Sequence, residues 1–105
     1  MRIEVRSGNT SLNKEMQTYA EYRVFVAIQR FASHIESIAI DVREVSPEQG
    51  RGAECDITVR LLGAGVVHMR SKGAHPAAAV DRAATQLECE MALNAASGQY
   101  TALRS

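Results

Sequence analysis

The chain has 105 residues, of which 46% are hydrophobic and 23% are charged, and its 12 basic residues balance its 12 acidic ones. This length and composition predict one globular domain, residues 1–105, with its own hydrophobic core. No apolar run approaches the ~20 residues that span a membrane, and the N-terminal stretch lacks the apolar segment of a signal peptide, so we expect a cytoplasmic protein without membrane contact. Zero net charge permits a nucleic-acid partner without favouring one, since such domains are usually strongly basic.

The chain opens with a predicted strand and a turn. Ile3 and Val5 alternate with charged residues over 2–6, which is the pattern of a half-buried strand. A turn at 7–10 follows, and we expect Asn9 or Ser11 to cap the helix after it.

Apolar residues then recur at helical spacing from 12 to about 32, which predicts a helix of about five turns. Further apolar residues widen this face beyond what one packing surface needs. These residues are Tyr22, Phe25 and Val26. They indicate a surface that binds a partner, and one possible partner is a second copy of the chain in a homodimer.

Three strands and a second helix complete the predicted elements. Residues 35–45, about 54–61 and 66–72 alternate between apolar and polar side chains. A polar loop at 46–52 joins the first two of these strands, and glycines at 63 and 65 suit a hairpin between the last two. Pro76 starts a helix that is expected to stop near Gly98, with a frayed tail after about residue 98.

The order of these elements predicts an α+β fold. A strand–helix–strand start implies a right-handed crossover, so strands 1 and 2 are expected to be parallel, whereas the hairpins that follow are antiparallel. Two amphipathic helices beside a sheet with one polar face should pack on the same side. We therefore predict a two-layer sandwich, β-α-β-β-β-α, whose four-stranded mixed sheet has the order 1-2-3-4 with both helices on one face.

The residues predict no enzyme, cofactor or metal site. The two cysteines, Cys55 and Cys89, form no C-x-x-C pair and are expected to be reduced thiols in or near the core. The three histidines are far apart in sequence, and no metal-binding pattern, nucleophile motif or glycine-rich phosphate loop is present.

Basic residues are the remaining candidates for binding. His68, Arg70 and Lys72 alternate on one strand face with no acid among them, which predicts a local positive ridge. The simpler interpretation is a charged edge strand that deters aggregation. On the helices, Lys14, Arg23, Arg30 and Arg82 are predicted to lie on solvent-facing sides.

Three short motifs follow one another along the chain: the Ile3-x-Val5 strand, a first helix containing Tyr19, and a last helix with Ala79-Val80-Asp81 followed by Leu87. Together they resemble the ribosome hibernation-promoting factor family, also called ribosome-associated inhibitor A or sigma-54 modulation protein. The resemblance implies the same β-α-β-β-β-α fold and a non-enzymatic protein of the stress response. Such a protein binds small-subunit ribosomal RNA in the decoding channel and silences idle ribosomes. Carried over by position, the RNA-binding residues are Lys14, Arg23, Arg30, Arg70, Lys72 and Arg82.

The chain also departs from this family, whose short form it resembles. The second helix has Glu88 and Glu90 but no basic residue after Arg82, and the first helix has an apolar 24–26 segment where charge is usual. Fewer phosphate contacts mean weaker, less salt-sensitive RNA binding. The alternative is therefore a protein-interaction or homodimerisation module on the same fold that has lost ribosome binding.

Overall fold

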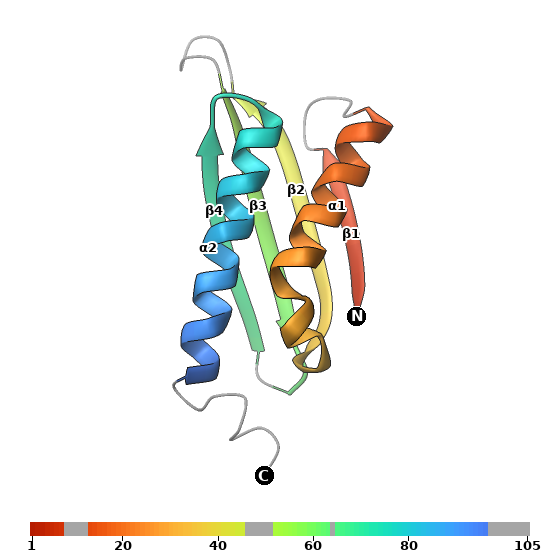
Figure 1. Ribbon diagram of the computed structural model, residues 1–105. Coiled ribbons are helices and arrows are strands. Elements are labelled where there is room, and N and C mark those ends of the chain that lie inside the picture. Colours follow the sequence, from red (N-terminus) through yellow and green to blue (C-terminus); the bar gives the residue numbers. More distant parts are fainter. Residues whose placement is uncertain (8–12, 46–51, 64, 97–105) are drawn as a thin grey trace.

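The computed structural model describes residues 1–7, 13–45, 52–63 and 65–96, and it has the predicted β-α-β-β-β-α arrangement (Figure 1). The predicted loop at 46–52 lies outside these residues except for Gly52, which begins a strand, and so do the helix end near Gly98 and the tail after it. The elements are β1 (Arg2–Ser7), α1 (Lys14–Ile28), the 3-10 helix η1 (Gln29–His34), β2 (Ile35–Val45), β3 (Gly52–Leu61), β4 (Gly65–Gly73) and α2 (Pro76–Ala96).

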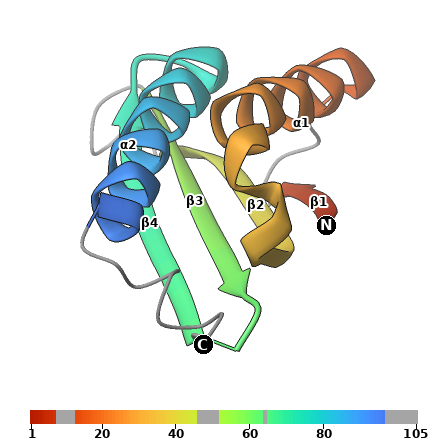
Figure 2. The same ribbon diagram turned by 60° about the horizontal axis from the view of Figure 1, so that its bottom comes forward.

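The sheet has the predicted order β1-β2-β3-β4. β1 pairs with β2 in parallel, and the β2–β3 and β3–β4 pairs are antiparallel. Both helices cover the same face of the sheet, α1 on the β1–β2 side and α2 on the β3–β4 side (Figure 2). The predicted α+β sandwich is therefore confirmed, and within the described part of the chain the other face of the sheet carries no helix.

The core lies between the sheet and the two helices. Alternate residues of β2 and β3 point into it, as the period-two pattern requires. Small alanines on α2 let this helix approach the sheet, and Leu87 and Met91 fill the space farther along it. The fully buried side chains of α2 are Ala79, Val80, Ala83, Ala84, Leu87 and Met91.

The first helix differs from its prediction at both ends. Its N-cap is Asn13, whose side-chain oxygen accepts a hydrogen bond from the Met16 amide at 2.7 Å, so the expected caps are wrong. The α-helix ends at Ile28, and the tighter η1 turn follows it. This turn buries Phe31, and the carbonyl oxygen of His34 accepts from the Leu62 amide at 2.9 Å, which ties η1 to the β3–β4 hairpin.

The two cysteines have different environments. Cys55 on β3 is buried in the core, as expected, but Cys89 is exposed on α2. The expectation for Cys89 is wrong because it lies beside Glu88 and Glu90 on the solvent side of the helix, away from the stripe that Leu87 and Met91 define. Among the described residues, no helix is long and apolar enough to cross a membrane.

Candidate nucleic-acid interface

The two helices are joined by polar contacts halfway along their facing sides. The Tyr19 hydroxyl on α1 donates a hydrogen bond to Oδ1 of Asp81 on α2. The same oxygen lies 3.4 Å from Nε of Arg23, and Nη2 of Arg23 donates to the Thr85 hydroxyl at 3.1 Å. Asp81, part of the motif that carried the family resemblance, therefore links the two helices.

These contacts correct the predicted position of Arg23. It does not extend freely into solvent, because it lies across the space between the helices with only 28% of its side chain exposed. The hydrogen bond to Asp81 raises the pKa of Tyr19, and burial and the negative charge of Asp81 add to this effect, whereas Arg23 opposes it. No local pattern predicts this bridge, since 62 residues separate its partners in the chain.

Replacing Asp81 with alanine is expected to lower the free energy of unfolding by about 1 kcal/mol, a value kept small because the pair is partly exposed. Urea unfolding measures this change. In the same variant the Tyr19 pKa should move down toward its usual value, which ultraviolet titration of the tyrosines detects. Thr85→Ala is the matched control: it removes one Arg23 contact and should leave the Tyr19 pKa unchanged.

Arg82 is exposed on the first part of α2. Its Nη1 donates to the backbone carbonyl of Lys72 at 3.3 Å, so the guanidinium lies over the C-terminal part of β4. The start of this helix is capped by His75, whose Nδ1 accepts a hydrogen bond from the Ala78 amide at 3.3 Å. Arg82 is therefore held near the β4 edge of the helical layer.

Lys14 and Arg30 lie at opposite ends of the first helical segment. Lys14 is the exposed first residue of α1, which is about 22 Å long. Arg30 is in η1, and its guanidinium carbon lies 4.7 Å from the centre of the Phe31 ring, a cation–π contact that leaves the side chain exposed. With Arg23 and Arg82, these residues form a dispersed basic set on the helical layer.

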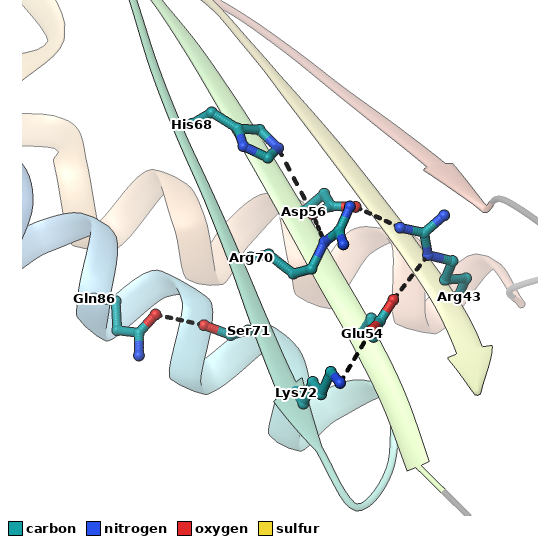
Figure 3. Close-up of polar contacts among 8 residues, drawn as sticks. All are labelled: Arg43, Glu54, Asp56, His68, Arg70, Ser71, Lys72 and Gln86. Carbon is teal, nitrogen blue, oxygen red and sulfur yellow. Dashed lines mark hydrogen bonds and ion pairs between the residues drawn. The ribbon is translucent and has the colours of Figure 1, made fainter. Parts of the chain in front are cut away.

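The remaining two candidates, Arg70 and Lys72, point away from both helices, on the open face of the sheet (Figure 3). Nε of Arg70 donates to Asp56 on β3 at 2.7 Å, and Nζ of Lys72 lies 3.7 Å from a carboxylate oxygen of Glu54. Arg43 on β2 contacts both acids, at 2.8 Å from Asp56 and 3.2 Å from Glu54. The open face therefore carries a cross-strand ion-pair network.

This network changes the interpretation of the β4 ridge. Strand β4 has no acid between His68 and Lys72, but β3 supplies acids beside it, and His68 itself lies 3.7 Å from Asp56. The hydrogen bond from Arg70 to Asp56, followed by the charge of that acid, raises the pKa of Arg70. The predicted positive ridge is thus largely neutralised, and the six candidates are divided between two faces of the molecule.

The helical layer also carries exposed acids. Their negative charge reduces the positive potential of the basic set. These acids, on both helices, are Glu15, Glu21, Glu88 and Glu90. Within the described ranges, no group of three or more histidine, cysteine or acidic side chains is placed to hold a metal ion. The arrangement is suited to modest phosphate contact through arginine and lysine.

The geometry defines a class: a two-layer α+β domain with an open, ion-paired sheet face and a sparsely basic helical layer. No family model and no curated protein matches the sequence. Among solved structures, the N-terminal domain of Protein Y from Thermus thermophilus is 23% identical, with a TM-score of 0.71 over 86% of this chain and 94% of that domain. A ribosomal subunit interface protein from Coxiella burnetii is 17% identical, with a TM-score of 0.78 over 91% of this chain and 99% of that protein. The fold expected from the resemblance is confirmed.

Proposed function

We propose that this protein is a non-enzymatic, ribosome-associated translation inhibitor. It binds small-subunit ribosomal RNA in the decoding channel and silences idle ribosomes, acting by steric occlusion. The observation that carries the proposal is the fold shared, over nearly the whole chain, with a protein described as a ribosomal subunit interface protein. With this function we also propose a cytoplasmic location.

The helical layer is the surface we assign to RNA. Lys14 and Arg82 are exposed and make no side-chain ion pair among the described residues, so they are free to meet phosphate. Arg30 is exposed as well, and Arg23 contributes positive charge from the space between the helices. Arginine suits this role because its planar donors bind phosphate in pairs.

The β4 residues have a secondary part in this proposal. Lys72 is 73% exposed on an edge strand, and Arg82 lies over its backbone, so both can reach RNA from the same edge. Arg70 already donates to Asp56, and a phosphate would have to displace that carboxylate. We therefore expect Arg70 to contribute least of the six.

Reversing charge on the helical layer tests the proposal. The double variant Lys14→Glu with Arg82→Glu should weaken co-sedimentation with isolated small ribosomal subunits about tenfold or more, because two attractive phosphate contacts become repulsive. Arg23 is left unchanged, since its reversal would place two acids together at Asp81 and disturb the fold. With four helical cations involved, the logarithm of the wild-type binding constant should fall with the logarithm of salt concentration with a slope of about −3.

A matched double variant distinguishes the effect of where the reversed charges lie from the effect of the change in net charge. The double variant Arg6→Glu with Arg60→Glu changes the net charge by the same amount as Lys14→Glu with Arg82→Glu. Its two substitutions lie on the open face of the sheet, where both arginine side chains are more than 60% exposed. This control should bind nearly as well as wild type. Equal loss in both double variants, or no wild-type binding at low salt, would contradict the helical-layer site.

A further inference from the structure

The flank of α1 that faces away from α2 is unusually apolar for a solvent-exposed surface. On this flank Tyr22 is 65% exposed and Phe25 40%. Val26 is 42% exposed but lies seven residues after Tyr19, on the side of α1 nearer α2, so it does not belong to this flank. Tyr22 and Phe25 line a shallow hollow of about 290 Å³, together with Ile3 of β1 and with Thr18 and Glu21 of α1. The exposed apolar surface thus continues from the helix down to the first strand of the sheet, and such continuous patches mark interaction sites.

Strand β1 is an edge of the sheet, since β2 is its one neighbour in the strand order. Its open-face side chains alternate in sign: Arg2, Glu4 and Arg6. Arg6 pairs with Glu4 of its own strand at 3.3 Å, and both remain more than half exposed. An unpaired edge is a template for another strand, and opposite charges directly across an antiparallel pair stabilise it.

The same edge is complementary to itself in one particular register. If two β1 strands run antiparallel about a two-fold axis through Ile3, Arg2 of each copy lies opposite Glu4 of the partner subunit. An axis through Glu4 would instead place Arg2 opposite Arg6 of the partner subunit and set like charges against each other. An axis through Val5 also pairs opposite charges, but Val5 does not line the apolar hollow, whereas Ile3 does.

Strand β4, the other edge of the sheet, has a different pattern of charged side chains from β1. Its open-face residues His68, Arg70 and Lys72 lie beside acids of β3, but two antiparallel copies of β4 would still set these basic side chains opposite one another. Lysine and arginine on an edge strand are a common protection against edge-to-edge pairing. The contrast leaves β1 as the edge that accepts a second copy.

From these observations we infer that the protein forms a two-fold symmetric homodimer through β1 and the α1 flank. The two sheets join edge to edge with Ile3 on the axis, and both α1 helices lie on the same face of the joined sheet. Tyr22 and Phe25 of the two copies then cover the two hollows. The inference does not rest on the proposed function, because Lys14 and Arg82 lie outside this seam.

Two charge-reversal variants, measured separately and then mixed, test the homodimer. The variants Arg2→Glu and Glu4→Arg each place like charges across the seam, and each should raise the dimer Kd about tenfold or more. Mixed in equal amounts, they should associate again, because the acidic edge of one then faces the basic edge of the other. Analytical ultracentrifugation measures the mass against the 11.4 kDa monomer, and circular dichroism checks the fold.

A matched pair of substitutions tests the apolar part of the seam. Tyr22→Glu should abolish the dimer, whereas Leu93→Glu, at a position also 65% exposed but on α2, should leave it intact. A wild-type protein that is monomeric up to ~1 mM would overturn the inference, as would failure of the mixed variants to associate. Loss of the dimer in Leu93→Glu but not in Tyr22→Glu would overturn it too.

Discussion

Replacing Gly73 with alanine should lower the free energy of unfolding by about 3 kcal/mol, one of the largest effects expected in this chain. Gly73 is the last residue of β4, immediately before the chain turns into α2. A Cβ atom there would lie 2.4 Å from the Ala79 amide nitrogen and 2.7 Å from the Ala78 carbonyl carbon. Both are backbone atoms, so no change of rotamer relieves the clash.

Relief requires the start of α2 and the end of β4 to move apart. Such a shift would open the closely packed contact of Ala79, Val80 and Ala83 with the sheet, all of which are fully buried. Close-packed interiors absorb such displacements poorly. We therefore expect chemical denaturation of Gly73→Ala to show a lower midpoint together with reduced protection of α2 amides in hydrogen exchange.

Gly52→Ala is the graded control. Its added Cβ would meet one backbone atom closely, the Gly73 carbonyl oxygen at 2.9 Å. The expected loss is about 1 kcal/mol, partly offset because alanine restricts the unfolded chain more than glycine. If the two variants are equally stable, the close approach of α2 to β4 does not carry the packing that we assign to it.

Most of the fold could be predicted because it depends on periodicity. The alternation along β2 and β3 and the helical stripe through Leu87 and Met91 are local patterns, and each determines which face is buried. The first helix was predicted too long because Phe31 continues the apolar spacing while the backbone has already tightened into η1. Apolar spacing does not distinguish an α-helical turn from a 3-10 turn.

The candidate site was less predictable because charge partners are set by strand register. Arg70 and Asp56 are 14 residues apart in the chain, yet register places them directly opposite each other on β3 and β4. Arg23 meets Asp81 only because the two helices pack side by side over the sheet. A count of basic residues therefore overestimates the positive surface of this protein, because Arg43, Arg70 and Lys72 already face acids of β3.

Alkaline pH should destabilise the protein through one buried thiol. Burial raises the pKa of Cys55 from 9.0 to about 12, with the nearby charges of Asp56 and Asp41 adding to the effect. In the unfolded chain the thiol ionises near its ordinary pKa, whereas in the fold it stays neutral. The stability that this difference contributes is present below pH 9 and is lost as the pH rises toward 12.

The expected loss is about 4 kcal/mol across that interval, from 1.36 kcal/mol per pKa unit. Guanidinium unfolding at a series of pH values measures it in wild type and in Cys55→Ala. The variant loses some packing at every pH, but its stability should fall less steeply above pH 9 because no buried thiol titrates. Tyr19 contributes in the same direction above pH 10 in both proteins, since its pKa is also raised, and it therefore cancels in the comparison. Equal slopes would mean that the Cys55 thiol ionises as readily in the fold as in the unfolded chain, and that the centre of β3 is open to water.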